Sequence, residues 1–198
     1  MKTAVNAAAY LHAEIAEHMA VALRTQESIG AEFPRLVQAC AQALRAGHKL
    51  LLFGNGGAAA AAQHIATELV VRYNRDSGNR RPLAAIALTT DTSALTAVSN
   101  DLGYEEVFAR QLAGLAQTGD IVIAISTSGR SKNVLKAAER ARELGCRTIA
   151  LTGASSDPLG SICDLTVAVP VNRTSRVQEA HITIGHLWCE MVDQIPEQ

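Results

Sequence analysis

Short apolar runs alternate along the chain with segments in which apolar residues recur at helical spacing. Each run ends in small polar residues, which is typical of a buried parallel strand and its exit loop. We expect five such strands, within 49–57, 83–91, 121–129, 146–153 and 165–170. Helical spacing follows them, at 58–73, 92–99, 104–117, 131–144 and about 175–195. This alternation predicts an α/β protein with a doubly wound, three-layer αβα arrangement and a five-stranded, mostly parallel sheet.

Two further helices precede the first strand. Helical periodicity runs from about Ala4 to Ile29, and a second helix is expected over 32–45, with Pro34 in its first turn, where a missing N–H is tolerated. The polar stretch 74–82 is the one linker-like segment, and we interpret it as a solvated loop rather than a contact with substrate or a partner. A length of 198 residues suits one α/β domain with a helical appendage.

Composition narrows the classes of function. The formal net charge is −1 and aromatic residues make up 4% of the chain, so we expect neither a nucleic-acid partner nor binding to a membrane. The four cysteines lack metal-binding spacing and fit buried thiols in a reducing compartment. No secretory signal is recognisable, and no apolar run approaches the ~20 residues that cross a bilayer. We therefore expect a cytoplasmic protein.

A glycine-rich turn leads into an alanine-rich helix at GNGGAAAAAQHIATELV (54–70). Glycines let the backbone turn tightly and expose N–H groups, and a helix that begins there attracts anions and carbonyl dipoles. A plain strand-to-helix turn without a ligand is the alternative. The spacing also fits a dinucleotide-binding fingerprint, but the acidic residue expected about 20 positions on is missing, because Asp91 lies too far along the chain.

Hydroxyl groups cluster at ISTSGRSKN (125–133), between a predicted buried strand and a helix. Ser126, Thr127, Ser128 and Ser131 can combine with backbone N–H groups at the helix start to form a phosphate cradle that needs no lysine. An ordinary turn with a capping serine would account for one or two of these hydroxyl residues, not for four. The cluster therefore favours phosphate binding.

Imidazole and carboxylate groups recur on two predicted helices. His64 and Glu68 are four residues apart and share one helix face, so they can hold one metal ion or one substrate. The segment RVQEAHITIGH (176–186) adds His181 and His186 beside a glutamine and a glutamate. A lone histidine on a helix is usually a packing residue. Together with a phosphate cradle, however, these groups indicate proton transfer on a phosphorylated metabolite.

The ordered set of motifs resembles the sugar isomerase (SIS) domain proteins and, within them, the phosphoheptose isomerases. The resemblance spans about residues 30–195 and is carried by GNGG with QHIATEL, SNDLGYE, ISTSGRS and RVQEAHITIGH. It implies one SIS domain over 1–198, with an oligomerisation helix at 1–30 and a core at 31–198. It also implies a homotetramer and one zinc ion (Zn²⁺) per subunit.

Site residues follow from the positions that match the family motifs. The implied acid–base pair is Glu68 and His186. The implied zinc ligands are His64, Glu68, Gln178 and His186. The implied substrate contacts are Asn55, Gly56, Gly57, Glu68, Asn100, Asp101, Ser126, Thr127, Ser128, Ser131 and Gln178. The family carries serine and aspartate where this chain has Ala58 and Ala61.

The resemblance implies an aldose–ketose isomerase that converts sedoheptulose 7-phosphate to D-glycero-D-manno-heptose 7-phosphate, a precursor of lipopolysaccharide heptose. Such a reaction moves a proton between neighbouring carbons through an enediol, which an acid–base pair can do. The alternative is a non-catalytic SIS module that binds a sugar phosphate or the bacterial replication initiator protein. Retention of both Glu68 and His186 favours the enzyme, whereas Ala58 and Ala61 point the other way.

Helix geometry adds an expectation about assembly. In one regular helix, Gln178 and His186 would lie about 12 Å apart along the axis and about 80° around it. Zinc ligands must converge to about 2.0–2.2 Å from the ion. We therefore expect one of two arrangements. Either Gln178 lies in a non-helical segment before the helix, or a neighbouring subunit supplies one of the two ligands, with His186 favoured as that ligand. The active site would then lie across a subunit interface.

Overall fold

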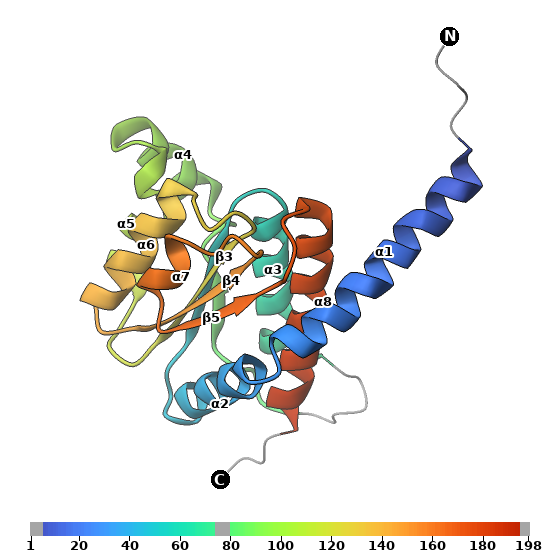
Figure 1. Cartoon of the computed structure of the whole chain (residues 1–198). Coiled ribbons are helices and arrows are strands. Elements are labelled where there is room, and N and C mark those ends of the chain that lie inside the picture. Colours follow the sequence, from blue (N-terminus) through green and yellow to red (C-terminus); the bar gives the residue numbers. More distant parts are fainter. Residues whose placement is uncertain (1–5, 74–79, 195–198) are drawn as a thin grey trace.

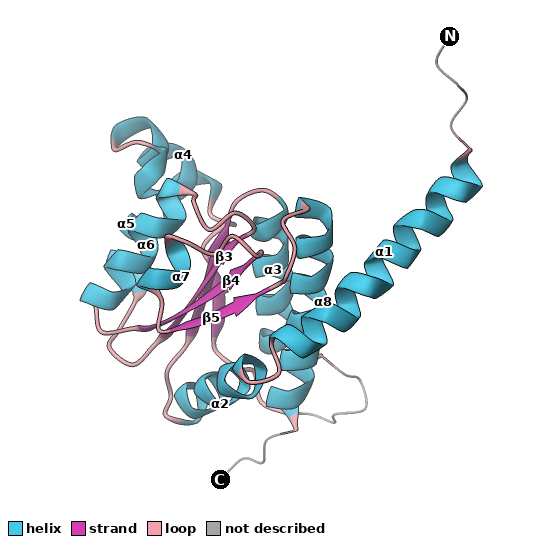
Figure 2. Cartoon of the chain, in the orientation of Figure 1, coloured by secondary structure: helices cyan, strands magenta, loops and turns pink. Residues whose placement is uncertain are grey.

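A five-stranded parallel sheet forms the centre of the molecule (Figure 2). The structure, a computed structural model, describes residues 6–73 and 80–194. The strands are β1 (Leu50–Gly54), β2 (Ala85–Ala87), β3 (Ile121–Ser126), β4 (Arg147–Thr152) and β5 (Leu165–Ala168). Their order is β2-β1-β3-β4-β5, and all four pairings are parallel. The predicted doubly wound sheet is confirmed, and every strand pair in the described residues is parallel.

Helices cover both faces of the sheet (Figure 1). They are α1 (Ala7–Ser28), α2 (Glu32–Arg45), α3 (Gly57–Val70), α4 (Thr92–Asp101), α5 (Val107–Leu115), α6 (Lys132–Glu143), α7 (Leu159–Ile162) and α8 (Thr174–Asp193), with a 3-10 turn η2 (Tyr104–Glu106). Side chains alternate across a strand. Leu50 and Leu52 of β1 therefore pack in the cluster that includes α2, α3 and α8, while Leu51 and Phe53 join the cluster of α5, α6 and α7.

Several elements differ from expectation. The helix predicted over 104–117 begins with η2, which follows Gly103 with its positive φ of 98°, and becomes α-helical only at Val107. The strand predicted over 83–91 pairs only at Ala85–Ala87. The short helix α7 was not predicted. The predicted ends at Ala4 and Ile195, and most of the loop 74–82, lie outside the described residues.

The strand order places a topological switch point between β1 and β3, where doubly wound sheets have their ligand crevice. From β1 the chain proceeds to β2 on one side, whereas from β3 it proceeds to β4 on the other. Ligands of doubly wound sheets bind at this switch point, outside the carboxyl ends of the two strands. Gly54 pairs with Ile125, so Asn55 and Ser126 flank the crevice at the same level. Two of the predicted clusters therefore meet where the topology favours a ligand.

Helix α1 projects from the body of the molecule (Figure 1). Its buried residues, Val21 and Thr25, lie in its C-terminal half, whereas an apolar stripe along it is exposed. The stripe consists of Leu11, Ile15, Met19 and Leu23, each more than half exposed. None of the described helices combines the length and the apolar character that crossing a membrane requires.

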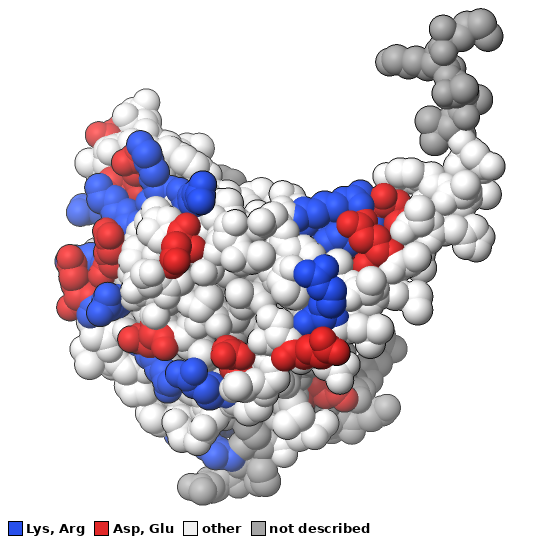
Figure 3. All heavy atoms as spheres, in the orientation of Figure 1, with Lys and Arg blue, Asp and Glu red and all other residues white. Residues whose placement is uncertain are grey.

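A charged cluster fastens α1 to the start of α8. Arg173 contacts Glu14 at 2.7 Å and also pairs with Glu17. Arg176, whose side chain is 6% exposed, pairs with both of these glutamates and lies 2.6 Å from Glu179 of its own helix. Figure 3 shows the basic and acidic groups gathered where α1 leaves the body. The cluster therefore joins the middle of α1 to the start of α8.

Candidate active site

The turn after β1 is shaped by three glycines. A Cβ on Gly54 would lie 2.6 Å from the Ile125 carbonyl oxygen, so this strand end tolerates no side chain. Gly56 precedes α3 with a left-handed φ of 55°. A Cβ on Gly57 would collide with the side-chain amide of Gln178. The predicted substrate residues Gly56, Gly57 and Gln178 therefore lie together at the start of α3.

Asn55 of this turn hydrogen-bonds to two residues that sequence reasoning missed. The Tyr104 hydroxyl and the Asn133 amide each donate to its Oδ1 at 2.9 Å. Both partners were inside quoted motifs, SNDLGYE and ISTSGRSKN, but neither motif indicated an internal partner for Asn55. Only their position in the sequence, a few residues after predicted site residues, could have indicated Tyr104 and Asn133.

The hydroxyl loop after β3 has the form of an anion cradle. Ser126 is 4% exposed, and its Oγ lies 3.5 Å from Oγ of Ser131. A turn closed by Gly129, with φ of 65°, brings the two serines together. Ser131 caps α6 without a side-chain hydrogen bond to the helix, so its hydroxyl stays available. Thr127 is half-buried and Ser128 is exposed on the same loop.

Asn100 and Asp101 lie apart from these groups. They end α4, are exposed, and bond to one another, with Asn100 Nδ2 donating to Asp101 Oδ1 at 2.7 Å. No hydrogen bond joins them to the other predicted site residues among 6–73 and 80–194. Their connection to the site runs through Tyr104, three residues further on, which reaches Asn55.

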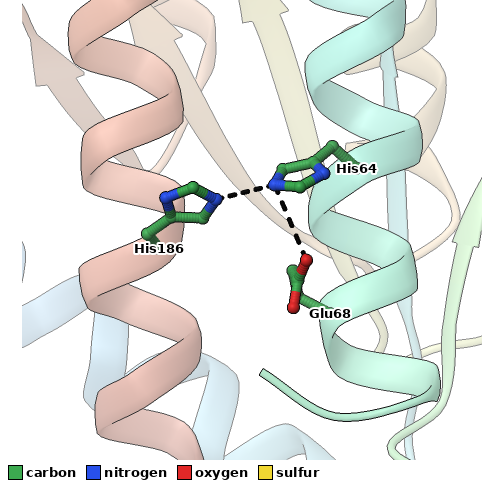
Figure 4. A group of neighbouring side chains, drawn as sticks. All are labelled: His64, Glu68 and His186. Carbon is green, nitrogen blue, oxygen red and sulfur yellow. Dashed lines mark hydrogen bonds and ion pairs between the residues drawn. The ribbon is translucent and has the colours of Figure 1, made fainter. Parts of the chain in front are cut away.

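His64, Glu68 and His186 converge between α3 and α8 (Figure 4). The two histidine Nε2 atoms are 2.6 Å apart, and His64 Nε2 lies 3.6 Å from Oε1 of Glu68. Gly185 permits the close helix approach, because a Cβ there would lie 2.8 Å from the Ile65 side chain. Residues separated by 122 positions are thereby brought into contact.

This group fits a divalent metal ion. Imidazole nitrogen and carboxylate oxygen are ligands that zinc takes, and the three ligand atoms lie within 4.8 Å of one another. Two imidazole nitrogens that face each other at 2.6 Å need a proton or a cation between them. The Tyr73 ring lies against His186, with ring centroids 5.6 Å apart. The donor set therefore suits the expected cofactor in its chemistry, with three of the four expected ligands brought together.

Two expectations about Gln178 and His186 are corrected. Gln178 lies inside α8, so the expectation of a non-helical segment there is wrong. His186 contacts His64 of the same chain, so the expectation that a neighbouring subunit supplies His186 is wrong. Gln178 instead contacts Gly57, seven residues and about 10 Å along α3 from His64. Within one chain, Gln178 lies at the glycine turn and not at the group of His64, Glu68 and His186.

The other polar groups of α8 have structural roles. His181 is 1% exposed, and its Nε2 lies 3.0 Å from the Thr152 carbonyl oxygen. Burial lowers the pKa of His181 from 6.5 to about 4, so the ring is neutral near pH 7. Glu179 is partly desolvated, but hydrogen bonds from His18 and Arg176 hold its pKa below its usual value. Neither side chain belongs to the metal group, by which we mean His64, Glu68 and His186.

Ala58 and Ala61 are both buried, at 5% and 4% exposure. Gly56 is the N-cap residue of α3 and supplies no side-chain cap, and a serine at position 58, inside the first turn, would not supply one either. A carboxylate at position 61 would be buried beside apolar residues of α3. Where the family has serine and aspartate, this chain therefore has two apolar side chains that pack in the core.

Comparisons with known proteins agree with this arrangement. The SIS domain family model matches residues 12–153. The phosphoheptose isomerase of a Nitratiruptor species is 47% identical over 185 residues, which is 93% of this chain and 97% of that relative. The solved phosphoheptose isomerase of Neisseria gonorrhoeae superposes with a TM-score of 0.87 at 37% identity, over 94% of this chain and 98% of that one.

A second solved phosphoheptose isomerase, from Francisella tularensis, gives a TM-score of 0.89 at 32% identity over 96% of this chain and the whole of that one. The similarity therefore covers the sheet, the hydroxyl loop and α8, and not one motif alone. From the extent of these matches, the chain belongs to the SIS domain family and, within it, to the phosphoheptose isomerases.

Proposed function

We propose that the protein is an aldose–ketose isomerase that converts sedoheptulose 7-phosphate to D-glycero-D-manno-heptose 7-phosphate, in the cytoplasm. The observation that carries the proposal is the convergence of His64, Glu68 and His186 in a fold whose hydroxyl loop suits a phosphate. The relatives named phosphoheptose isomerase support the choice of substrate.

The hydroxyl loop binds the phosphate end of the substrate. Ser126 and Ser131 converge at the crevice, and Thr127 and Ser128 complete the loop. Hydrogen bonds from hydroxyls to a phosphate dianion are charge-assisted, and the start of α6 adds N–H groups and a favourable dipole. Fixing the phosphate limits where the sugar carbons can lie, which lowers the entropic cost of reaching the reactive geometry.

Proton transfer falls to Glu68 and His186. The Glu68 carboxylate takes a proton from C1 and returns it to C2, while His186 moves the hydroxyl proton between O1 and O2. The carbonyl group thereby passes from C2 to C1 with no net change in protons. A divalent metal, zinc in this proposal, held by His64, Glu68 and His186 would supply Lewis-acid stabilisation of negative charge on the substrate oxygens.

A homotetramer with one zinc ion per subunit is the proposed assembly, with 1–30 as the oligomerisation segment of a single domain. The exposed stripe on α1 supports it, as does an apolar groove of about 460 Å³ between α1, α2 and α8. If Gln178 is a ligand of the same ion, a neighbouring subunit must supply it, because the chain's own Gln178 lies at Gly57.

A non-catalytic module is the second candidate, favoured by the apolar positions Ala58 and Ala61. A coupled assay with sedoheptulose 7-phosphate separates the two, using chelator-treated protein with and without added zinc. We expect turnover that returns with zinc. Binding of the sugar phosphate by calorimetry with no turnover under either condition would identify the protein as a binding module instead.

A further inference from the structure

The Asn55 side chain is held by a hydrogen-bond network that the proposed chemistry leaves without a role. Asn55 and Asn133 exchange two amide hydrogen bonds, in which Nδ2 of each donates to Oδ1 of the other at 2.9 Å. The Tyr104 hydroxyl donates to the same Asn55 Oδ1 at 2.9 Å. Asn133 is 3% exposed, so a buried residue anchors the half-buried Asn55.

This network spans the ligand crevice. Asn55 directly follows β1, whereas Asn133 lies in the first turn of α6, which follows β3. Strands β1 and β3 are neighbours at the switch point, and Tyr104 approaches from η2, a third segment. The backbone of Asn133 belongs to the start of the phosphate cradle, and its side chain reaches the glycine turn. Asn133 therefore connects the two parts of the proposed substrate site.

Counting hydrogen-bonding groups shows what Asn55 has left for a ligand. An asparagine side chain accepts two hydrogen bonds at its oxygen and donates two from its nitrogen. Both acceptor positions of Asn55 are filled, by Asn133 and Tyr104, and one N–H is donated to Asn133. In the described part of the chain, one Nδ2–H remains without a partner. Asn55 can thus act toward a ligand only as a donor.

We propose that Asn133 and Tyr104 are positioning residues that fix the Asn55 amide so that it presents a single N–H to an oxygen of the bound sugar. The inference rests on the proposed function and deepens it. A fixed donor is effective where negative charge develops on a carbonyl oxygen, because it needs no reorganisation during the reaction. Without its partners the amide could rotate and present its oxygen, which repels such a group.

A double-mutant cycle between Asn55 and Asn133 tests the proposal. Asn133→Leu keeps the side-chain size but removes both amide bonds, and we expect kcat/KM to fall about tenfold or more. Asn55→Ala should lower it similarly. Combined, the two should cost no more than about threefold beyond the worse single variant, because Asn133 acts through Asn55. Losses that multiply, or an Asn133→Leu variant within about threefold of wild type, would overturn the proposal.

Three further measurements separate positioning from general damage. Tyr104→Phe removes one donor from an exposed residue, and should lower kcat/KM in the same direction but less. Inhibition by inorganic phosphate should be unchanged in Asn133→Leu, since the hydroxyl loop is intact; a lost response would mean that the variant disrupts the loop and would contradict the proposal. Thr148→Val is the matched control, because Thr148 is also buried and its hydroxyl donates to Asp164. This variant should keep wild-type kcat/KM.

A crystal structure of Asn133→Leu makes the test independent of the isomerase assignment. We expect Asn55 to adopt a new rotamer or several rotamers. A single unchanged Asn55 rotamer would refute the positioning role even if the enzyme turns over its substrate. Conversely, a wild-type protein that does not isomerise sedoheptulose 7-phosphate, combined with a displaced Asn55 in the variant, would refute the proposed function while leaving the positioning role supported.

Discussion

The proposed function gives Glu68 two roles, as a ligand and as a base, which a carboxylate with two oxygens can combine. One oxygen, Oε1, lies 3.6 Å from His64 Nε2, and the side chain is 19% exposed. A carboxylate that holds a cation through one oxygen keeps the other for a proton. Such a double role requires a carboxylate that is only partly buried, as Glu68 is.

Glu68→Gln isolates the base. The amide keeps one oxygen and nearly the same shape but cannot accept the substrate proton, so we expect turnover to fall about a thousandfold. Affinity for the sugar phosphate should stay within about tenfold, because the hydroxyl loop is intact. Steady-state kinetics and calorimetry measure the two effects. Glu143→Gln, an exposed change on α6, is the control. More than a tenth of wild-type turnover in Glu68→Gln would show that another group is the base.

His181 makes the stability of the fold depend on pH. The pKa of its ring is about 4 in the folded chain and 6.5 without burial, so the unfolded chain binds more protons between these values. Its stabilising contribution is complete above pH 6.5 and is lost as the pH falls toward 4. This side chain is the packing histidine that helix statistics favour, whereas His186 on the same helix faces another histidine.

His181→Gln should reduce the acid sensitivity. Glutamine can still donate to the Thr152 carbonyl but does not titrate. We expect the loss of unfolding free energy between pH 7 and pH 5 to shrink by about 2 kcal/mol relative to wild type. Denaturant titrations at fixed protein concentration measure it. An equal pH dependence in wild type and His181→Gln would refute the role of His181.

At the scale of elements, the contact between α3 and α8 determines whether the metal group forms. The two helices run side by side, with Gly57 against Gln178 and Ile65 against Gly185. This register places His64 next to His186. A glycine in a helix interior costs helix stability, and here it allows the close approach that the metal group needs.

Gly185→Ala should therefore weaken zinc binding. The added methyl would lie 2.8 Å from Ile65 Cδ1 and Cγ1, so the Ile65 side chain or the two helices must shift. Overpacking of this kind destabilises by about 1–3 kcal/mol. Chelator competition should show lower zinc affinity, and adding Ile65→Val, which removes Cδ1, should restore part of it. Gly114→Ala, which meets nothing within 4 Å, is the control. Equal zinc affinity in Gly185→Ala would contradict this account.

The sequence predicted best those elements whose own residues are buried on both faces, and least those features that depend on contacts between distant segments. The apolar runs at β1, β3 and β4 predicted these strands because both of their faces are buried. The edge strand β2 was predicted too long, since it pairs only with β1. The motifs identified His64, Glu68 and His186, but their meeting depends on the Ile65–Gly185 contact, which no spacing encodes. Asn133 was missed because a buried hydrogen-bond partner has no periodic signature.

At the scale of the whole molecule, one chain leaves apolar surface uncovered. The stripe on α1 and the groove between α1, α2 and α8 lie on a helix that projects away from the sheet. The ion pairs of Arg173 and Arg176 with Glu14 and Glu17 join this helix to the start of α8. A surface of this kind is expected to be buried against other subunits.

Subunit mixing tests whether assembly also completes the site. Glu68 and His186 lie together in one chain, so oligomers mixed from Glu68→Gln and His186→Ala subunits should stay inactive, because every site would carry one of the two defects. Gln178 is the remaining ligand candidate, and its own chain holds it at Gly57. If a neighbour supplies it, mixing Glu68→Gln with Gln178→Ala subunits creates sites that have an intact Glu68 from one chain and an intact Gln178 from the other.

We expect such mixtures, after dissociation and reassembly, to recover about a quarter of wild-type activity or less, since only sites with the right pairing are intact. Native mass spectrometry would verify that mixed oligomers form. Recovery with Gln178→Ala and none with His186→Ala is the pattern that a shared site requires. If neither mixture recovers, each chain holds its whole site and Gln178 acts on the substrate of its own subunit. Recovery with His186→Ala would show that the intrachain metal group is not the catalytic one.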